Sequence, residues 1–235
     1  MTKTNQCAPR RAKYSGAQGT PLAPFFNRRK TDMSKFNFPP SILSRPVYGT
    51  LEYRTGSAHL LIADAHGAEA ILDVATSDMM AAAHIIYIPK DTAFGDRLRA
   101  LNPAQYYQGP SYAAATQRIV KAFSDAKMGL QVYLAGTEGV IGQAQYAAMQ
   151  AGVPHTAIQT EHRGSTARRM QCVHCKGITE DVETDPFQCA HCGLHLFVRD
   201  HYSRRQAAYQ GVNIDAEDPG NVPEPQMIYA KETSQ

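Results

Sequence analysis

Four of the five cysteines form two close pairs, a spacing that suits metal binding. The pairs are Cys172-x2-Cys175 and Cys189-x2-Cys192, and thirteen residues separate them. Each pair places two thiolates on one tight turn, so the two turns can converge on a single tetrahedral ion. The sequence therefore predicts a metal site whose ligands are Cys172, Cys175, Cys189 and Cys192.

The residues around the pairs leave the identity of the ion open. His174 and His191 lie inside the pairs, but four cysteines already complete a tetrahedral set, so they are weaker ligand candidates. Disulfides are disfavoured if the compartment is reducing. Gly177 and Gly193 are expected to adopt left-handed backbone that points amides at the sulfurs. Zinc would be redox-silent in this cage, whereas iron would carry one electron.

Upstream of the cysteines, short apolar runs alternate with segments of helical spacing. A module of roughly 40 residues has too little core to fold by burial alone, so a larger neighbour is expected. The strand-like segments are 47–53, 58–63, 83–89, 104–108, 130–136 and 155–161, and the helical segments are 67–80, 93–101, 112–126 and 140–152.

This alternation predicts the fold class. Strands and helices that take turns require parallel strands joined by right-handed crossovers. We therefore expect an α/β fold, a doubly wound parallel sheet of about five strands with helices on both faces. A small rubredoxin-like or zinc-ribbon-like metal module and extended tails complete the chain.

Composition divides the chain into four regions. Residues 1–40 carry eight Lys or Arg against one acid, although the whole chain has a net charge of only +3. This basic leader is expected to be disordered. An α/β domain at 41–163, a four-cysteine metal-binding module at 164–213 and an acidic, Pro-rich tail at 214–235 follow. The tail either lies across a partner or is disordered.

Targeting signals are not evident in the sequence. No run approaches the ~18 apolar residues of a membrane span, and no apolar segment follows the early basic residues as a secretory signal requires. We expect a cytoplasmic protein, which also favours metal ligation by the cysteines over disulfides.

Residues 132–161, "VYLAGTEGVIGQAQYAAMQAGVPHTAIQTE", resemble the end of the nicotinamide-binding lobe of ferredoxin reductases. The resemblance covers about residues 57–163. In that family a glycine-rich turn after the first strand cradles the pyrophosphate. Here the corresponding turn, residues 64–68, has the sequence DAHGA, with an acid and one glycine. The resemblance thus implies the lobe's fold without its phosphate site.

Other positions of the lobe also depart from the family pattern. Ala135 stands where the family has a cysteine beside the nicotinamide ring, and Thr137 stands where it has a proline. Gly136 and Gly139 remain as turn and packing glycines. We therefore assign no catalytic residue and no cofactor-binding residue to this chain.

The lobe, the cysteine module and the segment "RDHYSRR" at 199–205 together are similar to the small, DmmA-like subunit of bacterial dimethylamine monooxygenases. This resemblance covers nearly all of residues 40–235. It implies a non-catalytic subunit of an NAD(P)H-dependent complex that uses O2 to convert dimethylamine to methylamine and formaldehyde. The implied partners are a haem-containing catalytic subunit and a reductase subunit carrying FMN and a 2Fe–2S cluster, with those cofactors on the partners alone.

The resemblance favours iron over zinc at the cysteine site. A reductase that delivers single electrons and a haem that consumes them need a relay, and a four-thiolate iron centre supplies one. The alternative is a zinc-ribbon binding module whose basic leader contacts nucleic acid. Against it, the four-cysteine module has nearly as many acids as bases and lacks an evident aromatic and basic surface.

Residues outside these motifs receive weaker interpretations. Segment 199–205 mixes charges with an aromatic and suits an interface; alternatively it begins a helix, with Ser203 as the N-cap. The remaining prominent side chains are assigned to ordinary packing, namely His84, His155, Tyr106 and Tyr107.

Overall fold

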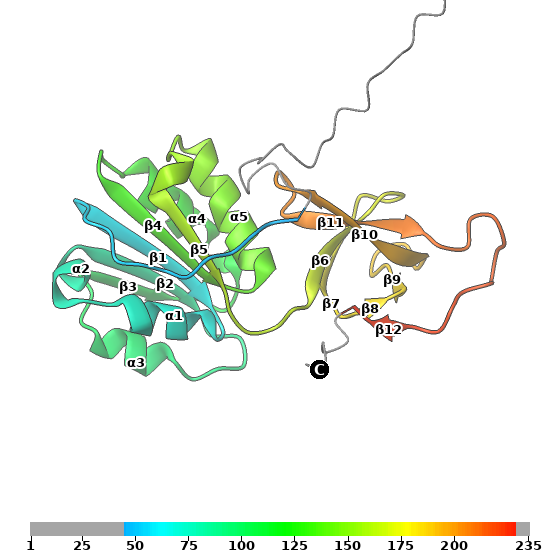
Figure 1. The fold of residues 1–235 in the computed structure, drawn as a ribbon, viewed down its shortest axis with the longest axis horizontal. Helices are drawn as coiled ribbons and strands as arrows, with labels where there is room; N and C mark the ends of the chain where they lie inside the picture. Colours follow the sequence, from blue (N-terminus) through cyan, green and yellow to red (C-terminus); the bar gives the residue numbers. More distant parts are fainter. Residues whose placement is uncertain (1–44, 229–235) are drawn as a thin grey trace, which may run out of the picture. The chain divides into compact units, whose positions relative to one another are not determined.

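The computed structural model describes residues 45–228, which belong to one compact unit. The basic leader with Cys7, and Tyr229 of the tail, lie outside the described residues. The first sheet has the strand order β3-β2-β1-β4-β5, and every pairing in it is parallel (Figure 1). Its strands are β1 (Ala58–Asp64), β2 (Ala83–Ile88), β3 (Gln105–Gln108), β4 (Leu130–Gly136) and β5 (Ile158–His162). The predicted doubly wound parallel sheet is confirmed.

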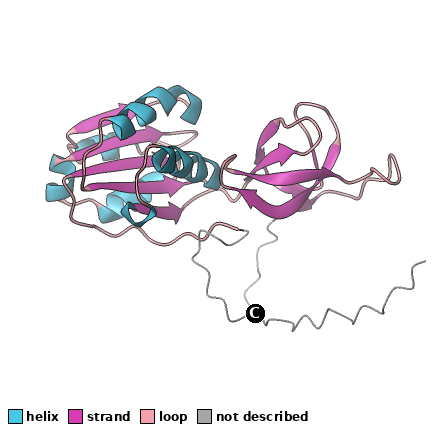
Figure 2. Ribbon diagram, turned by 90° about the horizontal axis from the view of Figure 1, so that it is seen from above, coloured by secondary structure: helices cyan, strands magenta, loops and turns pink. Residues whose placement is uncertain are grey.

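Helices cover both faces of this sheet (Figure 2). Alternate strand residues supply two separate cores, as the two-residue period of a strand requires. One core joins the sheet to α1 (Gly67–Val74), α2 (Ser77–Ala81) and α3 (Gly95–Ala100). The other joins it to α4 (Tyr112–Ser124) and α5 (Glu138–Gln150). No helix within residues 45–228 is long and apolar enough to cross a membrane.

The segment 67–80, predicted as one helix, is broken into α1 and α2. Ala75 is extended, with φ −64° and ψ 128°, so it ends α1. The Thr76 hydroxyl then accepts a hydrogen bond from the Met79 amide at 3.2 Å and caps α2. A side-chain cap inside an apolar helical pattern thus produces two helices in place of one.

The predicted strand at 47–53 is wrong. The segment is extended beside β5, but it forms only one backbone bond to that strand, from Gly49 N to Thr160 O at 2.9 Å. The next amides donate to side chains of β5 instead: Leu51 N to Glu161 Oε2 at 2.6 Å and Glu52 N to Gln159 Oε1 at 2.9 Å. Polar side chains of β5 therefore replace the ladder of a regular strand.

The second sheet holds the cysteines and is almost entirely β-structure. Its order is β7-β6-β11-β10-β9, and the short strands β12 and β8 form a separate pair. The strands are β6 (Arg168–Cys172), β7 (Ile178–Val182), β8 (Thr184–Asp185), β9 (Phe187–Gln188), β10 (His195–Ser203), β11 (Ala208–Asn213) and β12 (Gln226–Met227). We call residues 168–213 the ribbon.

Two expectations about the ribbon are settled by its strand pairing. Residues 199–203 belong to β10, paired with β11, so the interpretation of Ser203 as a helix N-cap is wrong. The described part of the acidic tail pairs with the chain's own β8 through β12, and Ile228 N donates to Glu183 O at 2.8 Å. Part of the tail is thus ordered on the ribbon itself.

Helix α5 carries the contacts between the parallel sheet's layer and the ribbon. Glu138, in its first turn, accepts hydrogen bonds at Oε1 from Tyr48 and Tyr209, each at 3.0 Å. Burial, and then the charge of Glu138, raise the pKa of Tyr48 well above its usual range. One turn further on, Gly142 lies against Tyr202 and Ala207; a Cβ there would be 2.9 Å from the Ala207 Cβ.

We predict that Gly142→Leu separates the ribbon from α5, because the added side chain has no space. Overpacking of this kind costs about 1–3 kcal/mol. The expected result is a lower denaturant midpoint and faster proteolysis within residues 163–167, measured on the metal-loaded chain.

Gly139→Ala is the matched control on the same helix. A Cβ at position 139 would lie 3.8 Å from the Arg169 side chain, an ordinary contact distance, and alanine is the better helix former. This variant should keep or raise the midpoint. A Gly142→Leu chain as stable and protease-resistant as Gly139→Ala would contradict the assigned contact.

Candidate functional site

The four predicted ligands meet at one point of the ribbon. Cys172 ends β6 and Cys175 lies in the turn after it, while Cys189 follows β9 and Cys192 lies in the next turn. The Cys172 and Cys192 sulfurs are 3.8 Å apart, and those of Cys175 and Cys189 are 3.7 Å apart. All four sulfurs lie within 4.8 Å of one another.

These distances fit a tetrahedral ion. With metal–sulfur bonds of about 2.3 Å, the edges of a tetrahedron of sulfurs measure about 3.8 Å. The cluster contains neither histidine of the turns; the His191 Nε2 lies 2.7 Å from the Ile178 carbonyl oxygen instead. Four soft thiolates suit zinc or iron equally, because both ions accept this donor set and geometry.

Backbone geometry around the sulfurs corrects one expectation. Gly193 has the predicted left-handed conformation, with φ +75°, but in the first turn this role falls to Lys176, with φ 64°, and not to Gly177. The left-handed position is the one directly after the second cysteine of each pair. Gly177 N still donates to the Cys175 sulfur at 3.4 Å. Because Gly177 has no side chain, His191 can pack against it. A Cβ added at position 177 would lie only 2.9 Å from the His191 Cβ.

The thiols of the second pair ionise very differently. Burial opposes ionisation of Cys189, but amide donors of Cys192 and His191 and neighbouring thiols outweigh it and lower its pKa to about 6. At Cys192 the Leu194 amide favours the thiolate, but desolvation and the other three sulfurs prevail and raise its pKa to about 12. A bound cation removes this conflict, because it stabilises all four thiolates together.

In the turn that corresponds to the phosphate turn of ferredoxin reductases, a side chain of the protein takes the place of a phosphate. Asp64, at the end of β1, is fully buried. Its carboxylate accepts hydrogen bonds from the Thr137 amide at 2.7 Å and hydroxyl at 2.6 Å, and the Lys90 ammonium lies 3.1 Å away. Thr137 is the N-cap of α5, so Asp64 occupies the position where a helix N-terminus would hold a bound phosphate.

The cleft at this edge of the sheet shows the same internal pairing. It measures about 360 Å³ and is lined by Lys90, Thr137, Arg169, Glu180 and Asp181, among others. Both of its cations have protein partners: Lys90 pairs with Asp64, and Arg169 Nε lies 2.9 Å from Glu180 Oε1. A nucleotide phosphate would have to displace these carboxylates.

Lys90 is the residue of this edge that sequence reasoning missed. It follows β2 by two residues. Because the carboxyl ends of parallel strands meet at one edge, a cation after β2 could have been matched with the acid that ends β1. The acidic residue at position 64 was the feature of the sequence that could have indicated a cation partner at this edge.

We predict that Asp64→Ala destabilises the chain by about 3 kcal/mol, since it leaves the Thr137 amide and Lys90 without their buried acceptor. Denaturant unfolding of the metal-loaded protein measures the change. Asp125→Ala is the control, because Asp125 pairs with Lys121 at 2.9 Å on the exposed surface of α4. Such a pair contributes about 0–1 kcal/mol. Equal losses for the two variants would refute the internal-anion role of Asp64.

We predict that the full chain binds one metal ion and that Cys189→Ser loses it. Because three thiolates no longer enclose the ion and the ribbon has little core of its own, the ribbon should unfold while the helical signal in circular dichroism persists. Acidification should also release the ion, since protons compete for the thiolates. Elemental analysis and circular dichroism make the measurements.

Cys7→Ser serves as the control for cysteine loss. Cys7 belongs to neither of the two cysteine pairs in the sequence, so this variant should keep one ion per chain. A Cys189→Ser chain that retained its ion with unchanged affinity would show that the four sulfurs are not the ligand set.

Comparison with known proteins gives the same two-part division. A family model described as dimethylamine monooxygenase subunit DmmA-like matches its N-terminal domain to residues 40–158 and its C-terminal domain to residues 169–212. The heme-dependent oxidative N-demethylase delta subunit of Ectopseudomonas mendocina (strain ymp) is 32% identical over 110 residues. That match covers 47% of this chain and 63% of the relative.

One solved structure is also similar, that of an intact type IV self-sufficient cytochrome P450 monooxygenase. The match has 16% identity and a TM-score of 0.36, and it covers 68% of this chain and 21% of the other. At that score it adds nothing to the assignment. The two family domains together span both the parallel sheet and the ribbon, and the chain therefore belongs to the DmmA-like family of dimethylamine monooxygenase subunits.

Proposed function

We propose that the chain is a non-catalytic electron-transfer and assembly subunit of a multi-subunit haem- and flavin-dependent monooxygenase. The complex removes a methyl group from dimethylamine: the amine, O2, NADPH and a proton give methylamine, formaldehyde, water and NADP+. Haem is placed on a catalytic subunit, and FMN and a 2Fe–2S cluster on a reductase subunit. The proposed location is the cytoplasm.

The observation that carries the electron-transfer role is the asymmetric exposure of the four cysteine residues. Cys172 and Cys189 are buried, whereas Cys175 is exposed and Cys192 is partly so. A site that reaches the surface on one side would lie within a short tunnelling distance of a partner docked there. Iron bound there would supply a one-electron couple.

Backbone amides of the chain support that role, because they donate hydrogen bonds to the sulfurs and so stabilise the negative charge of the metal site. The Gly177 amide donates to the Cys175 sulfur, and the amides of His191 and Cys192 act on Cys189. Such N–H donors offset the negative charge of a four-thiolate site and tune its potential.

The assembly role rests on the parallel sheet. Its carboxyl edge, where the likeness to reductases would place a nucleotide, is closed by Asp64 and its partners. A lobe that keeps its fold while the phosphate position is filled internally is suited to docking. Support also comes from the relative described as a heme-dependent oxidative N-demethylase delta subunit.

We predict that protein from its native host contains about one iron per chain. Its oxidised form should be red because of thiolate-to-iron charge transfer, and dithionite should bleach it. In the assembled complex Cys189→Ser should uncouple NADPH oxidation from demethylation while the flavin remains reducible. Absorption spectra and formaldehyde yield measure these outcomes.

Zinc-loaded chain is the control, since zinc fills the same cage but carries no electron. It should assemble with the partners as the iron form does and fail to support coupled demethylation. A colourless native protein with stoichiometric zinc would exclude the relay and leave assembly as the role of this subunit.

A further inference from the structure

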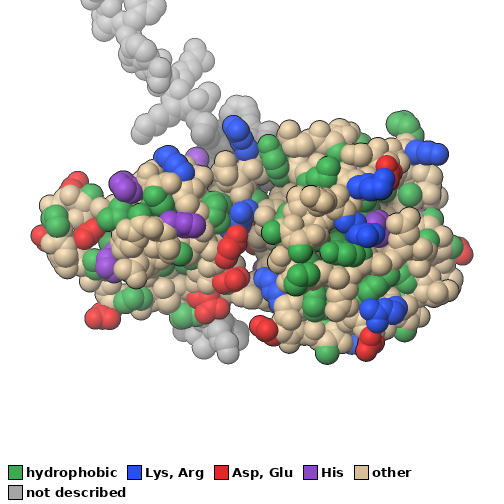
Figure 3. Space-filling model, turned by 180° about the vertical axis from the view of Figure 1, so that it is seen from behind, with side chains coloured by type: hydrophobic (Ala, Val, Ile, Leu, Met, Phe, Trp, Pro, Cys, Tyr) green, Lys and Arg blue, Asp and Glu red, His purple; other side chains and the backbone are tan. Residues whose placement is uncertain are grey.

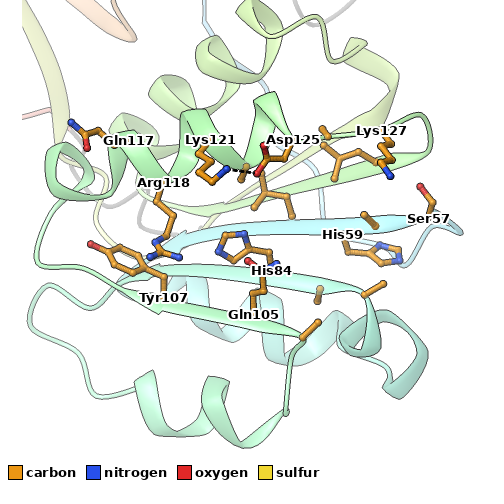
Figure 4. A pocket seen from close by; sticks show the side chains of 18 of the residues that line it. Ser57, His59, His84, Gln105, Tyr107, Gln117, Arg118, Lys121, Asp125 and Lys127 are labelled. Atoms are coloured by element: carbon orange, nitrogen blue, oxygen red, sulfur yellow. Dashed lines mark hydrogen bonds and ion pairs between the residues drawn. The ribbon is translucent and has the colours of Figure 1, made fainter.

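A second cavity lies at the opposite edge of the parallel sheet, where the strands begin. It measures about 820 Å³ and is lined by the first residues of β1, β2, β3 and β4 together with α4 (Figure 4). Ligands of doubly wound sheets bind at the carboxyl ends of the strands. This cavity is therefore separate from the edge that Asp64 closes.

The cavity exists because small residues occupy the strand starts and the facing helix. The described helices packed on this face of the sheet are α4 and α5, and α4 faces the starts of β2 and β3 across the cavity. Seven of the nineteen lining residues are alanines. The result is a slot between sheet and helix, with a volume in the range of small-molecule sites.

Two side chains of this slot, His84 and Arg118, carry nitrogens that have no hydrogen-bond partner among residues 45–228. His84 lies on β2 in register with Leu60 and Gln105, and its buried Nε2 has no hydrogen-bond partner among residues 45–228. Burial, and then the charge of Arg118, lower the pKa of His84. Both effects favour the uncharged ring, whose Nε2 is enclosed beneath the slot.

Arg118 supplies the main charge of the cavity. Its guanidinium lies 4.5 Å from the centre of the Tyr107 ring, and Figure 4 shows it reaching from α4 to a position between Tyr107 and His84. This stacking orients the guanidinium but leaves its N–H groups without a hydrogen bond to any described residue. An oriented arginine with free donors is a strong binder of carboxylate or phosphate.

The remaining charges also favour an anion. Arg118, Lys121 and Lys127 line the cavity against one acid, Asp125, which gives a formal balance of +2. Asp125 is already paired with Lys121. Lysine and arginine side chains are interspersed with hydrophobic ones on the face of the molecule drawn in Figure 3.

We propose that this cavity binds a small, flat molecule carrying a carboxylate or a phosphate. The anionic group bonds to the Arg118 guanidinium, and the flat body lies in the alanine-lined slot between α4 and the strand starts. The site is independent of the metal centre and of the electron-transfer role.

Three compounds that share one ring system test the proposal: 1-naphthoate, 1-naphthyl phosphate and the neutral 1-naphthamide. Each is titrated calorimetrically into the full, metal-loaded chain. At least one anion should bind at a single saturable site, roughly tenfold or more tightly than the amide, because a charged hydrogen bond is lost with the amide. The tighter of the two anions identifies the head group that the site prefers.

Arg118→Gln should reduce binding of that anion to the level of the amide and leave the amide's own affinity unchanged. The matched control is Arg99→Gln, because Arg99 stacks on the neighbouring Tyr106 at 5.0 Å but does not line the cavity. Ala122→Leu, which fills the slot from α4, should weaken all three compounds while circular dichroism stays unchanged.

Several results would overturn the proposal. They are equal affinity of the amide and both anions, full anion affinity in Arg118→Gln, or an equal loss in Arg99→Gln. Absence of saturable binding by either anion would overturn it as well.

Discussion

The ribbon depends on one constraint, the convergence of four sulfurs on a single point. Its core consists of few large side chains, chiefly Met170, Phe187, Leu196 and Tyr209, which is too little burial to stabilise a separate sheet. The turns that carry the sulfurs connect β6 to β7 and β9 to β10, so a bound ion also joins the two ends of the strand order. Placement of the ribbon's remaining side chains, including Tyr202 and Tyr209 against α5, follows from that convergence.

A second charged interaction organises the other half of the chain. Asp64, Lys90 and Thr137 bring together the ends of β1 and β2 and the start of α5. In a nucleotide-binding lobe the helix N-terminus at this point is left open for phosphate. Here a buried carboxylate satisfies it, which stabilises the fold and removes the ligand position in the same step. A doubly wound sheet can thus be retained for its surface while its usual site is closed.

The two edges of the parallel sheet consequently differ in character. At the carboxyl edge, every cation named above has a carboxylate partner. At the amino edge, Arg118 stacks on Tyr107 without an ion-pair partner among residues 45–228, and the Nε2 atom of His84 is buried there without a hydrogen bond to a described residue. A buried nitrogen without a hydrogen bond lowers the stability of the fold. That contrast distinguishes the amino edge from ordinary packing.

The sequence by itself determined the fold class and identified the four cysteines that converge as candidate metal ligands. Strict alternation of apolar runs with helical segments admits few topologies, and the spacing of the cysteines directly encodes two tight turns. Predictions from local sequence were less reliable wherever a side chain replaced the backbone as a hydrogen-bond partner. The Thr76 cap ends the predicted helix early and begins a second one. Glu161 and Gln159 accept the amides of the segment predicted as a strand, which is therefore extended without a strand ladder.

Only the tertiary structure decided which residues meet across the chain. Asp64 and Lys90 are separated along the chain by α1, α2 and β2, and Glu138 contacts Tyr48 and Tyr209, which lie far from it in opposite directions along the sequence. His84 and Tyr107 were assigned to packing, because sequence periodicity reports the face on which a residue lies but not whether a helix covers it. Such pairings depend on strand order and helix placement, which no local pattern specifies.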